Sequence, residues 1–239
     1  MFGQNPITNA FPKADGSLEI NSHFYTIQGE GMDAGRPSYF IRLAKCNLRC
    51  HFCDTPFDDG VVLSLDQLTE LVGKIKHDTL ANGIVVTGGE PLLQNIIPLV
   101  EAANQYDLYV SVETAGTVYR PGLEKYFDKH RSIKGNLITC SPKTGTINKM
   151  LEPLVGAYKY IIKANETDLD DGLPNMSTQN LGVPRRIFRP KDDHIPIYVQ
   201  PCDEQDVEKN RANMQVAAKV AMKYGYDLSL QIHKIVGLE

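Results

Sequence analysis

Residues 39–57 read YFIRLAKCNLRCHFCDTPF and combine a short apolar run with three closely spaced cysteines. The first part, Tyr39–Leu43, has the apolar and aromatic character of a buried β-strand. The cysteines follow directly, in the spacing Cys46-x3-Cys50-x2-Cys53. We therefore expect the chemistry of this chain to lie where this first strand ends.

Short apolar, β-branched runs recur along the chain and alternate with helical patterns. This order predicts βαβ units and a parallel sheet, and so the α/β class. We expect roughly six βα units that curl into a partial (β/α)6-type barrel. The predicted strands are Tyr39–Leu43, Ile84–Thr87, Leu108–Val112, Leu137–Thr139, Lys159–Ile162, Ile197–Val199 and a last short one at Leu228–Gln231.

Three helices have clear signals in the sequence. The first begins after Ser64, which forms a capping box with Gln67. The second covers Ile96–Tyr106, and the longest runs over about 204–224. Gly225 follows the longest helix as a stop signal.

Two segments fall outside this alternation. Residues 1–18 are polar and contain Gly and Pro, so we expect an N-terminal extension before a single domain at 19–239. Residues 164–196 contain four prolines, several acids and few periodic apolar residues. So long a connection is typical of a family-specific insertion or a lid.

Composition restricts the function classes. The net charge is −4 and the pI is about 5.9, which disfavours nucleic-acid binding because that usually needs a basic face. No apolar run approaches the roughly 18 to 20 residues of a membrane span, and the N-terminus has no secretory signal. We therefore expect a cytoplasmic protein. Five cysteines, three of them clustered, favour metal or redox chemistry over disulfides.

The cysteine cluster suits an iron–sulfur centre. Thiolates are the usual ligands of such clusters, and three local cysteines leave one iron of a four-iron cluster open. The amino and carboxylate groups of S-adenosylmethionine can bind such an open iron. The cofactor would then carry the radical chemistry, while the protein supplies position and shielding.

A structural zinc site is the alternative for the same cysteines. Zinc usually takes four closed ligands, often from two cysteine pairs. His51, Cys140 or Cys202 could supply a fourth ligand, but the sequence contains no second pair. Without a metal role, Cys140 and Cys202 are interpreted as small buried thiols.

The cysteine motif and a second motif together resemble the radical S-adenosylmethionine (radical SAM) superfamily. Its signature is the same cysteine spacing with an aromatic residue, here Phe52, before the last cysteine. Residues 87–91, Thr-Gly-Gly-Glu-Pro, resemble its second motif, whose backbone holds the amino group of the cofactor's methionine. On its own, Gly-Gly-Glu-Pro indicates only a tight turn.

Further motifs narrow the resemblance to the 7-carboxy-7-deazaguanine synthase family. They run from about residue 23 to 234, and several follow predicted strands, whose carboxyl ends build the ligand site in βα folds. The motifs are Phe24–Gly31, Gly35–Ser38, Phe40–Leu43, Cys53–Thr55, Glu113–Thr117, Ser141–Lys143, Gln200–Pro201 and Gln231–Lys234.

The resemblance implies an enzyme that converts 6-carboxy-5,6,7,8-tetrahydropterin to 7-carboxy-7-deazaguanine with loss of ammonia, in queuosine biosynthesis. Its cofactors would be a 4Fe-4S cluster, S-adenosylmethionine and Mg²⁺. The reaction would take a hydrogen atom from the substrate carbon that bears the carboxylate and later return it. A homodimer and an electron donor such as flavodoxin or ferredoxin are implied as partners.

The resemblance also implies roles for single residues. Cys46, Cys50 and Cys53 would bind the cluster, and Thr55 would ligate Mg²⁺ through its hydroxyl. Contacts to S-adenosylmethionine would come from Phe52, Cys53, Asp54, Gly89, Glu90, Ser141, Pro142, Lys143, Gln200, Pro201, Cys202 and Asp203. Contacts to the pterin would come from Ile27, Gln28, Gly29, Glu30, Arg42, Thr87, Glu113 and His233, with Arg42 and His233 at the carboxylate.

Each of these roles has a structural alternative. A guanidinium fork matches a carboxylate, but an arginine such as Arg42 more often forms a surface ion pair. Glu113 could instead stabilise a helix N-terminus, and Thr55 could cap a helix or turn. Because a hydroxyl alone is a poor Mg²⁺ ligand, substrate and water oxygens would be needed as well. His233, on a terminal strand, could be a half-buried structural histidine.

Two rival functions stay open. A glycyl-radical-enzyme activase shares the cysteine spacing and the Gly-Gly-Glu-Pro turn but acts on a protein. Residues 26–31 and Arg42 argue against it. The second rival is a non-enzymatic module stabilised by zinc. A member of the superfamily that modifies nucleic acid is disfavoured because the sequence has no basic appendage.

Overall fold

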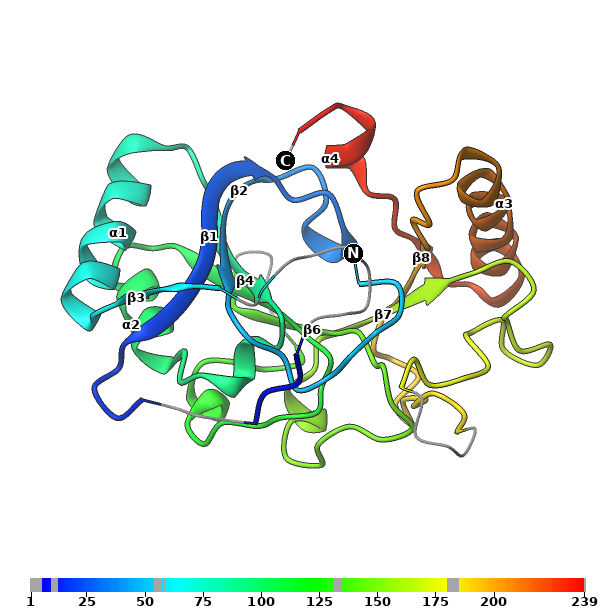
Figure 1. The fold of residues 1–239 in the computed structure, drawn as a ribbon, viewed down its shortest axis with the longest axis horizontal. Helices are drawn as coiled ribbons and strands as arrows, with labels where there is room; N and C mark the ends of the chain where they lie inside the picture. Colours follow the sequence, from blue (N-terminus) through cyan, green and yellow to red (C-terminus); the bar gives the residue numbers. More distant parts are fainter. Residues whose placement is uncertain are drawn as a thin grey trace.

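The computed structural model describes residues 6–9, 13–53, 57, 59–130, 135–179 and 185–238. The strands of this part form one sheet in the order β3-β1-β2-β4-β5-β6-β7-β8-β9 (Figure 1). The strands are β1 Leu18–Ile27, β2 Pro37–Leu43, β3 Val61–Leu63, β4 Gly83–Gly88, β5 Tyr109–Thr114, β6 Leu137–Cys140, β7 Ala157–Ile162, β8 Ile197–Pro201 and β9 Asp227–Leu228. The helices are α1 Leu65–Asp78, α2 Ile97–Gln105, α3 Val207–Tyr224 and α4 Ile232–Ile235, and the 3-10 turns are η1 Gly31–Asp33, η2 Pro91–Leu93, η3 Leu123–Lys125 and η4 Glu152–Leu154.

The parallel sheet expected from the sequence is confirmed. From β2 to β9, every pair of neighbouring strands is parallel. β1 is antiparallel to both β2 and β3. In the described residues the sheet is not closed, because β3 and β9 lie at its two edges. The fold is therefore an open α/β sheet of the partial-barrel kind.

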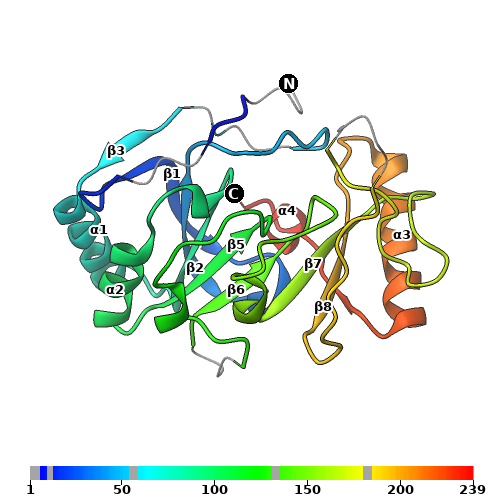
Figure 2. The same ribbon diagram turned by 90° about the horizontal axis from the view of Figure 1, so that it is seen from below.

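Continuous apolar runs explain why the middle strands are parallel. Ile84, Val85 and Val86 of β4 are each 0% exposed, so this strand is buried on both faces. Strands buried on both faces are typical of parallel sheets covered by crossover helices. Figures 1 and 2 show α1 and α2 at one end of the sheet and α3 alongside β8 at the other.

The predicted signals at the start of α1 and at the end of α3 are confirmed. Ser64 Oγ accepts a hydrogen bond from Gln67 N, and the Gln67 side chain accepts one from Ser64 N, which completes the capping box of α1. Gly225 ends α3 with a φ of 75°, in the left-handed region that glycine tolerates. The start of α3 was predicted too early, at Glu204. The helix begins at Val207 because Asp206 accepts hydrogen bonds from two amides of its first turn, both at 3.0 Å.

Several elements differ from the prediction. The sequence analysis did not predict β1, and the last strand is only Asp227–Leu228. In the described residues, the connections from β5 to β6 and from β6 to β7 contain 3-10 turns in place of helices. Proline and glycine explain this, since Pro121, Gly122 and Pro153 interrupt any helical run there.

The two segments set apart by the sequence analysis both contact the sheet. Leu18, at the end of the predicted extension, is the first residue of β1 and is 0% exposed. Thr8 N donates to Cys46 O at 2.7 Å. In the described parts of 164–196, Arg189 pairs with Asp171 and the Tyr160 hydroxyl donates to Phe188 O. The domain boundaries and the lid role stay predictions. No described helix is long and apolar enough to cross a membrane.

Candidate functional site

A cavity of about 480 Å³ lies at the carboxyl ends of the parallel strands. Its walls come from β2, β4, β5, β7 and β8, from the segments that follow β1 and β6, from the cysteine loop after β2 and from the C-terminal segment around α4. Parallel register brings these strand ends together, as Arg42 pairs with Thr87 and Ile162 with Pro201. This is the edge at which α/β sheets bind ligands.

The Thr-Gly-Gly-Glu-Pro motif locks the end of β4 to the cysteine loop. Gly89 N donates to Leu43 O at 3.2 Å, and Glu90 N donates to Lys45 O at 3.0 Å. A Cβ on Gly88 would overlap Leu43 O, and one on Gly89 would overlap Lys45 O. Gly88 also has a φ of 132°. Only glycine permits so close an approach of two backbones.

Glu90 lies beneath this contact and not in the cavity wall. Its carboxylate is 0% exposed and accepts hydrogen bonds from Thr114 Oγ1 at 2.7 Å, Ala115 N at 2.9 Å and Leu92 N at 3.0 Å. Burial raises the pKa of Glu90 above its ordinary value. Through these hydrogen bonds, the Glu90 side chain joins the turn after β4 to the end of β5.

A buried lysine connects the predicted pterin-binding residues. Lys159 on β7 contacts Glu30 and lies 3.3 Å from Glu113 Oε2. Gln28 Nε2 donates to Glu113 Oε1 at 3.0 Å. Burial alone would lower the pKa of Lys159, but Glu113 and Glu30 raise it instead. The lysine is therefore a cation that holds both carboxylates in place.

Glu30 is the acceptor at the centre of this network. Besides Lys159, Gln231 Nε2 donates to its Oε1 at 2.8 Å and Gln200 Nε2 donates at 3.1 Å. Burial disfavours the charged carboxylate, yet Lys159 and the hydrogen bond from Gln231 lower the pKa of Glu30 to about 2. Glu30 thereby joins the N-terminal motif to β7, β8 and the C-terminal segment.

The C-terminal segment packs against Gly29. Ile232 N donates to Gly29 O at 3.1 Å, and a Cβ on Gly29 would overlap His233 Nδ1. His233 lies in α4 and lines the cavity, so the predicted terminal strand at this residue was wrong. The glycine leaves the space that the imidazole occupies. Burial lowers the pKa of His233.

Arg42 points into the cavity from β2. Its guanidinium lies 5.4 Å from the centre of the Phe24 ring. Among the residues that the structure describes, no carboxylate forms an ion pair with it. A guanidinium that faces a cavity in this way suits a ligand carboxylate better than a surface ion pair.

The loops after β6 and β8 form part of the cavity wall. Ser141 N donates to Thr114 O at 2.8 Å, and the Lys143 ammonium binds Ser141 Oγ and Ser141 O. After β8, Cys202 N donates to Ile162 O at 2.8 Å, and Lys234 Nζ binds Asp203 Oδ2 at 2.7 Å. Both loops continue parallel strands and present polar groups to the cavity.

Most predicted site residues meet in this one cavity. Its wall contains Gln28, Glu30, Arg42, Cys46, Cys50, Phe52, Cys53, Thr87, Gly89, Glu113, Ser141, Lys143, Gln200, Pro201, Cys202, Asp203 and His233. Ile27, Gly29, Glu90 and Pro142 are not part of the wall, although each adjoins a residue that is. Asp54 and Thr55 lie outside the described residues.

The sequence analysis missed several wall residues. Lys159 and Leu238 line the cavity, as do Phe40, Gln231 and Lys234, which were noted only as parts of motifs. Lys159 had a signal: it is a charged residue inside the apolar run AYKYII of β7. A lysine in a strand that is otherwise buried needs a partner of opposite charge.

The cysteine loop fits an iron–sulfur cluster. Cys46 is buried, and Cys50 and Cys53 are half-buried thiols. All three cysteines line the cavity wall, as ligands that share one cluster must.

The burial of Cys46 also indicates a bound metal. Burial raises the pKa of its thiol to about 12. A thiolate at this position therefore needs metal cations beside it, which bound iron supplies.

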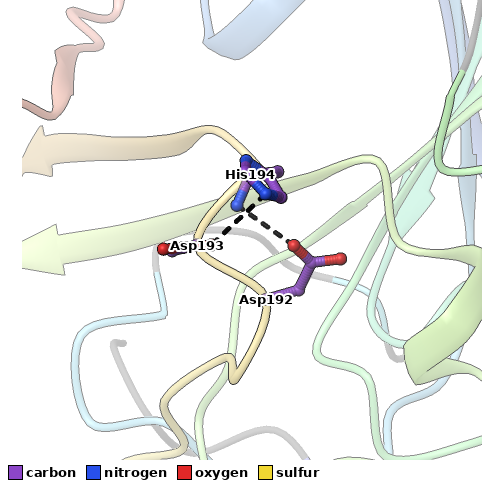
Figure 3. Close-up of side chains that lie close together, drawn as sticks. All are labelled: Asp192, Asp193 and His194. Carbon is purple, nitrogen blue, oxygen red and sulfur yellow. Dashed lines mark hydrogen bonds and ion pairs between the residues drawn. The ribbon is translucent and has the colours of Figure 1, made fainter.

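A second group of ligand-type side chains lies outside the cavity. Asp192, Asp193 and His194 have ligand atoms within 4.8 Å of one another (Figure 3). Asp193 and His194 are 94% and 90% exposed, and Asp192 already pairs with Lys129 at 2.7 Å. The group precedes β8, at the opposite end of that strand from the cavity. It has no part in the site.

Comparison with known proteins identifies the family. The profile described as Radical SAM superfamily matches residues 40–185. A Rhodospirillum rubrum protein named 7-carboxy-7-deazaguanine synthase is 41% identical, over 99% of this chain and 99% of its own length. A Rickettsia prowazekii protein of the same name is 37% identical, over 100% of this chain and 96% of its own length. This chain belongs to the 7-carboxy-7-deazaguanine synthase family of radical SAM enzymes.

The fold also has a solved counterpart. The crystal structure of QueE from Escherichia coli superimposes with a TM-score of 0.64 at 22% identity, covering 90% of this chain and 94% of that one. At this identity the likeness concerns the fold alone. Membership of the radical SAM superfamily implies S-adenosylmethionine and a 4Fe-4S cluster, which agrees with the cysteine loop. The relatives of the 7-carboxy-7-deazaguanine synthase family favour neither the activase nor the zinc module.

Proposed function

We propose that this chain converts 6-carboxy-5,6,7,8-tetrahydropterin to 7-carboxy-7-deazaguanine with loss of ammonia. The observation that carries the proposal is a single cavity whose wall contains both the three cysteines and the polar side chains that could bind a pterin. The named relatives, which match almost the whole chain, support it. The proposal assigns the two halves of the cavity to cofactor and substrate.

Arg42 and His233 would bind the substrate carboxylate. The Arg42 guanidinium faces the cavity and can donate two parallel hydrogen bonds to a carboxylate. His233 approaches from α4, where Gly29 leaves room for it. A carboxylate placed between them would give Arg42 the ion-pair partner that none of the described residues supplies.

Glu113 and Gln28 would recognise the amino-pyrimidinone edge of the pterin. That edge presents N–H donors, for which the Glu113 carboxylate is a suitable acceptor. Gln28 and Lys159 each bind one oxygen of this carboxylate. Their hydrogen bonds fix its orientation before the substrate arrives, which lowers the cost of ordering the site.

When bound, the cluster and S-adenosylmethionine supply the one-electron chemistry that removes a hydrogen atom from the substrate. This chain must hold the reacting carbon near the cofactor and exclude water. Ser141, Lys143, Gln200 and Asp203 would position the cofactor. The apolar wall side chains Phe40, Leu48, Phe57 and Ile161 would exclude water.

Other parts of the proposal rest on the resemblance. Thr55 would contribute its hydroxyl to a Mg²⁺ ion whose remaining ligands come from substrate and water. An external electron donor such as flavodoxin or ferredoxin would reduce the cluster. We also propose a homodimer in the cytoplasm, with residues 164–196 covering the site.

Anaerobic turnover tests the proposal. The reconstituted protein should be brown, contain about four irons, and release 7-carboxy-7-deazaguanine and ammonia from carboxytetrahydropterin, as measured by mass spectrometry. Cys50→Ala should abolish the product. A four-iron protein that makes no deazaguanine would contradict the function, and a colourless protein with one zinc would favour the module.

A further inference from the structure

Residues 177–179 form a short strap that joins two loops of the site. Ser177 Oγ and Thr178 N both donate to Lys143 O, at 2.8 and 3.0 Å. Ser177 N donates to Arg185 O at 2.8 Å. The strap is thus tied to the loop after β6, although it belongs to the long segment between β7 and β8.

The strap reaches the sulfur of one predicted cluster ligand. Thr178 Oγ1 lies 3.2 Å from Cys50 Sγ, and Gln179 Nε2 donates to the same sulfur at 3.4 Å. Gln179 Oε1 accepts from Arg49 N at 3.0 Å. Because that backbone amide can only donate, it fixes the Gln179 amide with its NH₂ group toward the sulfur.

Both side chains can donate once Cys50 binds iron. A metal-bound thiolate has no proton and accepts hydrogen bonds only. Gln179 Nε2 also donates to Thr178 Oγ1 at 2.9 Å, so the threonine hydroxyl keeps its own proton for the sulfur or for Lys143 O at 3.3 Å. Cys50, Thr178 and Gln179 are all half-buried, which limits competition from water.

We propose that Thr178 and Gln179 raise the reduction potential of the cluster by hydrogen bonding to Cys50 Sγ. Reduction adds a negative charge that is shared with the ligand sulfurs. Hydrogen-bond donors to those sulfurs stabilise the reduced form, and they are one of the known determinants of cluster potential. The inference rests on the cluster of the proposed function, but not on the identity of the substrate.

An EPR-monitored redox titration of the anaerobically reconstituted holoenzyme tests this role. Thr178→Val and Gln179→Met remove one donor each and nearly conserve volume. Each variant should have the iron content of the wild type but a more negative midpoint potential of the cluster. In the double variant we expect the ratio of reduced to oxidised cluster at a fixed potential to fall about tenfold, which for one electron is about 59 mV. Thr178→Ser keeps the hydroxyl and should keep the wild-type midpoint.

Matched controls separate this effect from general perturbation. Gln105→Met, at the exposed end of α2, and Thr69→Val, on α1, make the same chemical changes away from the cluster and should leave the midpoint unchanged. Wild-type midpoints in both strap variants would overturn the inference. Loss of iron from both would also overturn it, because the strap would then hold the ligand loop without tuning the cluster. A failure to form deazaguanine would refute the proposed function and leave this comparison intact.

Discussion

Lys159 Nζ lies 3.3 Å from Glu113 Oε2, although the two residues come from strands separated by β6. Their side chains are 7% and 20% exposed, so the ion pair is largely shielded from water. Glu30 contacts the same ammonium from the N-terminal motif. One cation therefore holds two carboxylates of the cavity wall.

Replacing the buried cation should destabilise the fold. Lys159→Met leaves Glu30 and Glu113 without their shared positive charge, and removing one partner of a buried pair typically costs about 3–5 kcal/mol. Chemical denaturation of the apo protein measures the loss. Lys74→Met, which breaks an exposed pair on α1 with Glu70, is the control and should cost less than about 1 kcal/mol. Equal losses in the two variants would contradict the buried-pair account.

The same network should make stability depend on acid pH. In the folded state the pKa of Glu30 is about 2, below its ordinary 4.5, because Lys159 and hydrogen bonds outweigh the effect of burial. A lowered pKa stabilises the folded state above pH 4.5, and that contribution disappears as the pH falls toward 2. The difference in free energy of unfolding between wild type and Glu30→Gln should shrink across this window. A difference that does not change with pH would contradict the assignment.

Adding a methyl group at Gly29 should displace His233. Gly29→Ala places a Cβ where the imidazole ring lies, so we expect a raised KM for carboxytetrahydropterin with cluster content unchanged. His233→Ala removes the obstacle, and the double variant should be no worse than His233→Ala alone, since neighbouring changes are not additive. Additive effects on KM would show that the two residues act separately.

Arg42 should discriminate in favour of the substrate carboxylate. Arg42→Met removes a charge-assisted, two-point contact that is worth about 1.5–3 kcal/mol, or roughly 10- to 150-fold in affinity. Equilibrium binding of carboxytetrahydropterin should weaken by that factor. Wild type and Arg42→Met should bind tetrahydropterin, which lacks the carboxylate, with the same affinity. An equal loss for both ligands would place Arg42 at another part of the substrate.

Local sequence signals predicted the parts of the fold that local interactions determine. The capping box of Ser64 and Gln67 depends on residues three apart, and the stop at Gly225 depends on a single backbone conformation. The cysteine motif likewise lies within one loop. The sequence failed where the partner is distant. β1 was missed because its pairing with β2 and β3 decides its structure, and its outer residues, such as Tyr25 at 47% exposed, hide the alternation of a strand.

The candidate site shows the same division between features set by local sequence and features set by distant partners. Strand ends with polar motifs predicted most of the cavity wall, because parallel strands end at one edge. Lys159 was missed because its partners Glu30 and Glu113 lie 129 and 46 residues away in the sequence. His233 was placed on a strand because the segment after Leu228 is too short to distinguish a strand from a helical turn by periodicity. His233 packs against Gly29, which is distant in the sequence, and this contact is visible only in the folded structure.

Hydrogen transfer between substrate and cofactor tests most directly that the two share this cavity. Carboxytetrahydropterin carrying deuterium on the carbon that bears the carboxylate would be incubated with reconstituted enzyme and S-adenosylmethionine. The account predicts deuterium in the recovered S-adenosylmethionine, together with 7-carboxy-7-deazaguanine. Deazaguanine product with no deuterium in the recovered S-adenosylmethionine would contradict it.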